Sequence, residues 1–124
     1  MADRNLEPIC YHYEKKMKRV VGSFRPNGVS AVLDKKGKGF TVVRTSAGLF
    51  TVTFSDKFVD LYHVVPHLRL ATGDDKIAQA GTFSMANKTL QIRVWDISGA
   101  AETDVAADAN NVISFVAEFK DSSV

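Results

Sequence analysis

The sequence predicts an all-β protein, either an antiparallel β-sandwich or a jelly-roll-like barrel of seven to eight strands. Three observations predict this fold class. Apolar and polar residues alternate in short segments, aromatic and β-branched residues fill those segments, and turn residues separate them at fairly regular spacing. The sequence does not distinguish a jelly-roll connectivity from a Greek key.

The chain of 124 residues is predicted to form one β-sandwich domain, residues 17–124, preceded by an extended N-terminal arm, residues 1–16. The arm mixes apolar and charged residues without a clear period. Tyr11, His12 and Tyr13 either form a short extended segment that docks on a neighbouring molecule or belong to a loosely packed terminus. Both interpretations stay open.

The first strand is predicted over residues 17–24, because apolar residues recur there at every second position. One face of this strand carries Val20, Gly22 and Phe24. Residues 25–28 are predicted to form a turn, since proline fixes φ while asparagine and glycine accept left-handed geometry. Residues 34–39 are predicted to be a polar loop interrupted by glycines.

The most complete element is a β-hairpin over residues 40–55. Apolar and polar residues alternate on both sides of Ser46-Ala47-Gly48, which predicts a three-residue loop that ends in a left-handed glycine. The predicted cross-strand pairs are Thr45 with Leu49, Val42 with Val52 and Phe40 with Phe54. The apolar faces of the two strands then coincide, so the turn chemistry and the burial pattern agree.

Residues 55–61 are predicted to form a 3₁₀ turn or a tight connection, because the apolar run is too short for a stable helix. A strand follows over residues 63–71. Its inward residues are Val64, Leu68 and Leu70, and its outward residues are His63, His67 and Arg69. Pro66 has no N–H to donate to a ladder, which indicates a sheet edge or a bulge.

A second hairpin is predicted from strands over residues 77–84 and 90–97, after a turn at residues 72–76. Residues 98–111 are predicted to be a long loop. The last strand covers residues 112–119 and turns Ile113, Phe115, Ala117 and Phe119 inward. The predicted core comprises Phe24, Phe40, Phe50, Phe54, Leu68, Ile92, Val94, Phe115 and Phe119.

Composition indicates a globular protein that folds in a reducing compartment. The chain is 45% hydrophobic and 24% charged, which argues against wholesale disorder. A single cysteine, Cys10, excludes an intrachain disulfide. The N-terminus lacks the apolar region of a signal peptide, and no segment approaches the length of a membrane span, so we predict neither secretion by that route nor a membrane partner.

Charge is unevenly distributed along the chain, although the net charge is only +2. Residues 1–48 contain ten Lys and Arg against four Asp and Glu, whereas residues 49–124 contain six against ten. The two halves therefore carry +6 and −4. Such asymmetry indicates an interaction surface, provided that the halves do not interleave in the fold.

We predict no catalytic, cofactor-binding or metal-binding site, and therefore no enzyme. His63 and His67 share a strand face about 13 Å apart at the usual rise per residue, too far to ligate one ion. Four acidic residues gather in and beside the 98–111 loop without the ligand spacing of an EF-hand, so a solvated loop is favoured over a calcium site. These are Asp96, Glu102, Asp104 and Asp108.

Nucleic acid is a further partner class that we considered and do not favour. Residues 15–19 (KKMKR) form a basic run beside Tyr11 and Tyr13, and Lys35, Lys36 and Lys38 form a second basic run. Basic groups with nearby aromatic rings can hold a backbone and stack bases. The total charge is nearly balanced, however, and short lysine runs are common on solvated strand edges.

Five segments together carry a resemblance to a known group of proteins. They are residues 21–28 (VGSFRPNG), 37–54, 78–81 (AQAG), 88–96 (KTLQIRVWD) and 104–111 (DVAADANN). These segments resemble small structural proteins of tailed-bacteriophage virions, and the resemblance spans residues 21–119. Each segment is a strand-and-turn signature, and none is a chemical motif.

The resemblance implies a capsid decoration or cement protein, a homotrimer that binds the major capsid protein on the outer shell of the head. The expected location is the capsid surface of the virion, after assembly in the host cytoplasm. The alternative is a tail- or fibre-associated module that recognises a host surface polymer through exposed aromatic residues such as Tyr11, Tyr13 or Tyr62. Trp95 either anchors an interface or packs under the 98–111 loop.

Overall fold

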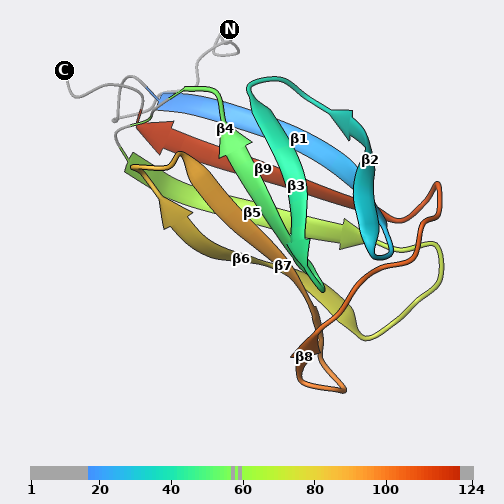
Figure 1. Cartoon of the computed structure of the whole chain (residues 1–124). Helices are drawn as coiled ribbons and strands as arrows, with labels where there is room; N and C mark the ends of the chain where they lie inside the picture. The colour runs from blue at the N-terminus through green and yellow to red at the C-terminus, as the bar shows by residue number, and fades with distance from the viewer. Residues whose placement is uncertain (1–16, 57, 59, 121–124) are drawn as a thin grey trace, which may run out of the picture.

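Nine strands in two antiparallel sheets make up the regular structure of residues 17–56, 58 and 60–120, which are the residues that the computed structural model describes (Figure 1). The strands are β1 (Met17–Asn27), β2 (Ser30–Lys36), β3 (Phe40–Ser46), β4 (Leu49–Phe54), β5 (Asp60–Arg69), β6 (Lys76–Ser84), β7 (Thr89–Asp96), β8 (Ala101–Glu102) and β9 (Val112–Lys120). The prediction of an all-β antiparallel sandwich is confirmed, although the described residues form nine strands where seven to eight were predicted.

The two sheets lie face to face, and their strand orders supply the connectivity that the sequence left open. Sheet A has the order β2-β1-β9-β5, and sheet B has the order β3-β4-β7-β6 with β8 paired to β7. Sheet B is the nearer layer in Figure 1. Met17, the first residue of β1, pairs with Lys120, the last residue of β9. The N-terminal arm, the tyrosines in it and Cys10 lie outside the described residues.

The core between the sheets is built from the inward residues of each alternating strand. Eight of the nine predicted core residues are buried, and Leu68 is partly buried against them. Further buried apolar residues are Val20, Val52, Phe58, Leu90, Val105, Ile113 and Ala117. Aromatic rings join the two sheets: the ring centroids of Phe40 and Phe115 are 5.1 Å apart, and those of Phe54 and Phe119 are 4.8 Å apart. Tilted and edge-on ring pairs of this kind add to the stabilisation from burial itself.

The register of the predicted hairpin is confirmed through most of its length. Phe40 pairs with Phe54 and Val42 pairs with Val52, and Gly48 has the expected left-handed φ of 67°. Near the turn the prediction is wrong, because Leu49 pairs with Ser46 after an irregularity in β3. The extra residue at that point is a bulge, which a glycine in the left-handed region commonly accompanies.

The predicted bounds of the turn over residues 25–28 and of the polar loop over residues 34–39 are wrong. β1 continues to Asn27, and the chain reverses at Gly28 and Val29. Pro26 is tolerated in the strand because the pairing of β1 with β9 ends at Phe24 and the pairing with β2 is irregular beyond it. Residues 34–36 belong to β2, so the polar loop is only residues 37–39.

β5 occupies an edge of sheet A, which confirms the interpretation of Pro66. An edge strand has one side without ladder partners, so a residue without an N–H can be placed there. β5 also carries a bulge between Leu61 and His63. The remaining strands over residues 76–84, 89–96 and 112–120 agree with prediction to within one residue at each end.

The predicted long loop over residues 98–111 contains a short strand and is tied down at several points. β8 pairs with the end of β7, Trp95 opposite Glu102. The backbone N–H of Gly28 donates to the Val105 carbonyl at 2.8 Å, and the N–H of Thr103 donates to the Val94 carbonyl at 3.1 Å. Val105 is buried, so this segment closes one end of the sandwich. The described residues include no helix that could cross a membrane.

Candidate functional site

The acidic residues that the sequence grouped together have separate structural roles. Asp96 accepts hydrogen bonds from the N–H and the hydroxyl of Ser98, at 3.1 and 2.8 Å, and so closes the β7–β8 turn. Glu102 lies 3.5 Å from Arg93, and Asp108 accepts a backbone hydrogen bond within its own loop. Among the residues that the structure describes, no three His, Cys, Asp or Glu side chains are placed to hold a metal ion.

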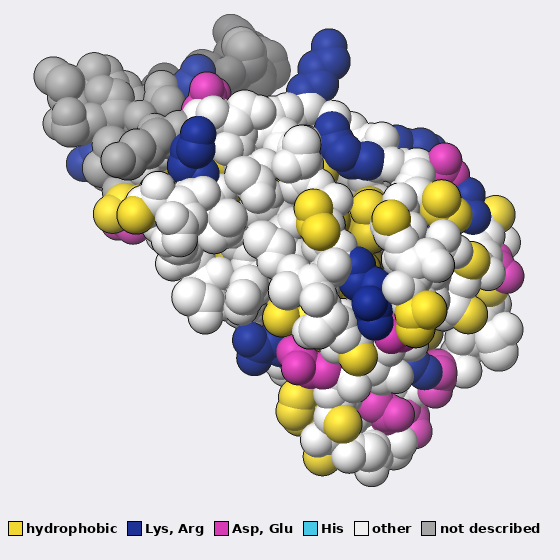
Figure 2. All heavy atoms as spheres, in the orientation of Figure 1, with side chains coloured by type: hydrophobic (Ala, Val, Ile, Leu, Met, Phe, Trp, Pro, Cys, Tyr) yellow, Lys and Arg dark blue, Asp and Glu magenta, His cyan; other side chains and the backbone are white. Residues whose placement is uncertain are grey.

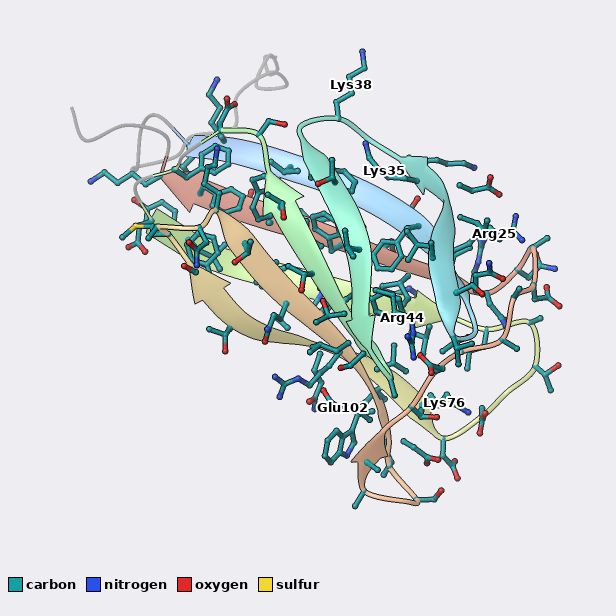
Figure 3. All side chains as sticks on the ribbon, in the orientation of Figure 1. Arg25, Lys35, Lys38, Arg44, Lys76 and Glu102 are labelled. Atoms are coloured by element: carbon teal, nitrogen blue, oxygen red, sulfur yellow. The ribbon has the colours of Figure 1, made fainter. Side chains whose placement is uncertain are left out.

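Asp104 fastens its loop to the β3–β4 hairpin. Its two carboxylate oxygens accept hydrogen bonds from Nε and Nη2 of Arg44 at 3.0 and 2.8 Å, and Oδ1 also accepts from the N–H of Gly48 at 3.0 Å. Figure 3 shows Arg44 at the end of β3 that faces this loop. The hydrogen bonds from Arg44 lower the pKa of Asp104, and the same pairing raises the pKa of Arg44.

The outer face of sheet A carries an ion cluster, which we define as Arg19, Glu118 and His63. These residues lie side by side in register on β1, β9 and β5. Arg19 donates to Glu118 Oε2 from Nη2 at 2.8 Å and from Nε at 3.1 Å, and His63 Nε2 forms a hydrogen bond with Glu118 Oε1. The hydrogen bond with His63, followed by that with Arg19, lowers the pKa of Glu118.

A valine band, consisting of Val21, Val116 and Val65, crosses the same face next to the ion cluster. The three residues are aligned in register on β1, β9 and β5. Val21 and Val65 are 53% and 55% exposed, and Val116 is half-buried. Contiguous apolar surface of this kind is a common element of protein contact surfaces.

A basic pocket of about 480 Å³ opens at the far end of this face, where β9 begins. Its lining includes the cationic or titratable side chains of Arg25, Lys36, His67 and Arg69, together with Ser23, Ser114 and Asp34. Ser23 and Ser114 lie directly opposite each other on β1 and β9, with Lys36 and His67 paired on their outer sides. The two predicted surface histidines therefore lie in different environments, His63 in the ion cluster and His67 at the pocket.

The outer face of sheet B is different, because short uncharged side chains occupy most of it. Thr41, Thr53 and Thr89 form one row across three strands. Figure 2, which views this side, shows few charged groups over the middle of the sheet and acidic side chains gathered towards β8. The strands of residues 1–48 and those of residues 49–124 lie on opposite sides of each sheet, so the two halves of the chain do not interleave. In sheet A, β2 and β1 lie beside β9 and β5, and in sheet B, β3 lies beside β4, β7 and β6.

The remaining candidate residues lie apart from one another. Lys35 and Lys38 lie near the β2–β3 turn, and the ammonium of Lys35 is 4.6 Å from the ring centroid of Phe40 (Figure 3). Trp95 is half-buried beside β8, and Tyr62 is 41% exposed on β5. Residues 15 and 16 of the other basic run, like Tyr11 and Tyr13, lie outside the described residues.

Sequence reasoning did not predict the pocket, because its members are distant in the chain. Ser23 and Ser114 are short outward residues within alternating strands, and nothing local marks them. The available signal was the outward placement of His67 and Arg69, two residues apart on β5. The residues that lie beside His67 and Arg69 on neighbouring strands can be identified only when the strand order is known.

Comparisons with models of protein families, with curated proteins and with solved structures found no match to this chain. The resemblance to virion proteins therefore stays a prediction from the sequence.

Proposed function

We propose that this chain is a structural protein of a bacteriophage virion, a capsid decoration or cement protein that binds the major capsid protein on the outer shell of the head. The sequence resemblance over residues 21–119 supports this class. In this proposal the protein acts through protein–protein contacts and performs no chemistry, and it sits on the capsid surface after assembly in the host cytoplasm.

The observation that carries the proposal is the outer face of sheet A. The valine band is exposed there between the ion cluster at one end and the polar row of Ser23 and Ser114 at the other. An apolar strip with polar and charged flanks matches the usual composition of a protein interface, with its apolar centre and polar rim. A protein that binds the assembled shell but not the free capsid subunits stabilises the shell by mass action.

The homotrimer is part of the same proposal. Edge strands expose unpaired backbone groups, and symmetric association is one way to cover them. β2 and β5 are the edges of sheet A, and β3 and β6 are the outer strands of sheet B. Sedimentation equilibrium of the purified protein is expected to give a mass near three chains, and a monomer at high concentration would contradict this part.

Copy number in purified particles tests the proposal most directly. A decoration protein is expected in hundreds of copies on the head, measured by a quantified gel and located by particle reconstruction. The competing proposal is a tail- or fibre-associated module that binds a host polymer, and the exposed ring of Tyr62 favours it. Six or twelve copies at the tail would support that alternative and reject the decoration protein.

A pair of substitutions tests the contact surface itself. Val65→Lys places a charge in the valine band, and it is expected to abolish binding to shells that lack the protein while leaving the far-UV circular dichroism unchanged. Val43→Lys is the matched control, because Val43 is 59% exposed on the outer side of sheet B. Equal binding by both variants would show that the valine band is not the contact surface.

A further inference from the structure

We propose that the basic pocket binds an oxyanion, that is, a phosphate or sulfate group that is either free or carried by a larger molecule. This inference is independent of the virion proposal. It rests on the geometry of the pocket: cationic side chains from β1, β2 and β5 surround a floor of two serines on the outer face of sheet A.

The charges in the pocket are only partly neutralised within the protein. Arg25 pairs with Asp34 through Nη1, and its Nε is buried without a hydrogen-bond partner. Lys36 and Arg69 form no ion pair with any described residue. Counting Arg25, Lys36, Arg69 and Asp34, the lining carries a charge of +2 with His67 neutral. Guanidinium and ammonium groups that outnumber the carboxylates around them are the usual surroundings of a bound oxyanion.

The ion cluster on the same face shows what the pocket lacks. In the cluster, Glu118 of β9 lies between Arg19 and His63 of the two flanking strands. Ser114 lies on the same side of β9, four residues earlier, between Ser23 of β1 and His67 of β5. Lys36 of β2 lies opposite Ser23, one strand further out. A small hydroxyl therefore replaces the carboxylate at the centre of the row. The space and the positive charge both remain for an external anion.

The floor of the pocket suits oxygen ligands. The hydroxyls of Ser23 and Ser114 can each donate one hydrogen bond, and the flanking cations supply further donors. A volume of about 480 Å³ lies within the range of small-molecule sites, so the pocket can hold a phosphate together with part of the group that carries it.

The site is tested by titrating the full-length protein with inorganic phosphate at constant ionic strength. The amide NMR chemical shifts are recorded during the titration. Saturable shifts are expected at Ser23, Ser114 and their strand neighbours. Arg69→Gln and Lys36→Gln are each expected to weaken binding about tenfold, because each removes a charge-assisted hydrogen bond. Lys38→Gln removes the same charge from a side chain in the β2–β3 turn that does not line the pocket, and it is expected to leave binding unchanged.

Asp34→Asn supplies a test in the opposite direction. Asp34 has a left-handed φ of 48°, which asparagine tolerates, so the variant is expected to fold. It removes the only carboxylate among the described lining residues and releases Arg25, and binding of phosphate is expected to tighten several-fold. Unchanged or weaker binding by this variant would contradict the proposal.

Two further probes identify the source of the oxyanion. Glucose 6-phosphate that binds with shifts confined to the pocket supports a small phosphorylated ligand. A short single-stranded oligodeoxynucleotide that binds more tightly, with shifts extending past the pocket, supports a phosphate polymer. The proposal is overturned if no phosphate probe binds, if Lys38→Gln weakens binding as much as Arg69→Gln, or if a glutamate-rich peptide is preferred to every phosphate probe.

Discussion

Gly48 marks the closest approach between the β3–β4 turn and the segment that follows β8. A Cβ atom at this position would lie 2.5 Å from the carbonyl oxygen of Thr103 and 2.9 Å from that of Val94. Both contacts are with backbone atoms, and moving these atoms would cost free energy. Gly28 has nearly the same φ, 59° against 67°, but a Cβ there would meet nothing within 4 Å.

These two glycines provide a matched comparison of strain and steric overlap. Gly28→Ala is expected to lower the free energy of unfolding by about 1 kcal/mol, the cost of a left-handed alanine. Gly48→Ala adds overpacking to the same backbone cost and is expected to lower it by about 3 kcal/mol. Urea unfolding followed by circular dichroism measures both values. Equal losses would show that the loop yields to the added methyl group.

The charge of Asp104 contributes to the stability of the fold through its ion pair with Arg44. Asp104→Asn keeps the shape of the side chain but removes the ion pair with Arg44, and it is expected to cost about 1 to 2 kcal/mol of unfolding free energy because the pair is only partly exposed. Asp108→Asn is the control, since Asp108 is exposed and accepts only a local backbone hydrogen bond. A similar loss for both variants would exclude the proposed anchoring role.

The pH dependence of this stabilisation follows from the sign of the pKa shift. The pKa of Asp104 is lower in the folded protein than its unfolded value of about 3.9, so the folded protein gains stability above that pH. The gain is lost as the pH falls through the folded pKa. The stability difference between the native protein and Asp104→Asn is therefore expected to be constant from neutral pH to about 5 and to shrink below about pH 4.

At the scale of strands, the ion cluster connects three neighbouring strands of sheet A through residues that lie in register. Glu118 on the central strand β9 receives Arg19 from β1 and His63 from β5. His63→Ala removes the largest cause of the lowered pKa of Glu118 and is expected to raise that pKa towards its ordinary value. Carboxyl-carbon NMR titration measures it. An unchanged pKa would mean that Arg19 alone sets the charge state.

The strands differ in how readily the sequence predicts them, and burial explains the difference. β3, β4, β7 and β9 each alternate between buried and outward residues, so a two-residue period marks them. β2 has no buried residue and ends in Asp34-Lys35-Lys36, so it has the composition of a loop. β8 has only two residues and owes its existence to pairing with β7. Strands made by pairing alone leave no periodic signal.

At the scale of the whole molecule, the alternation that predicts two sheets does not predict how they are ordered. Strand order places Ser23 beside Ser114 and brings Arg25 and Arg69 to one pocket, although these residues belong to β1, β9 and β5. The predicted loop of acidic residues came from adjacency in sequence, and the structure separates its members. Sites formed across strands depend on topology, whereas the core depends on local pattern.

The described domain is expected to fold without the arm. The buried core residues that the structure describes lie between Val20 and Phe119, and the first strand pair begins at Met17. A variant that begins at Met17 is expected to keep the far-UV circular dichroism and the melting temperature of the full chain. A large fall in melting temperature would show that residues 1–16 contribute to the core. If this variant folds but no longer binds capsids, the arm makes the shell contact.

The pairing of Met17 with Lys120 has a practical consequence for protein engineering. Paired Cα atoms of antiparallel strands are about 5 Å apart, so a linker of a few residues would join the two positions and permit a circular permutant opened at the Gly28–Val29 turn. Proteins fused at Met17 or at Lys120 would be attached at the same end of the domain. Ser23 is six residues along β1, about 20 Å from Met17, so such fusions would leave the opposite end of the sandwich open for ligands.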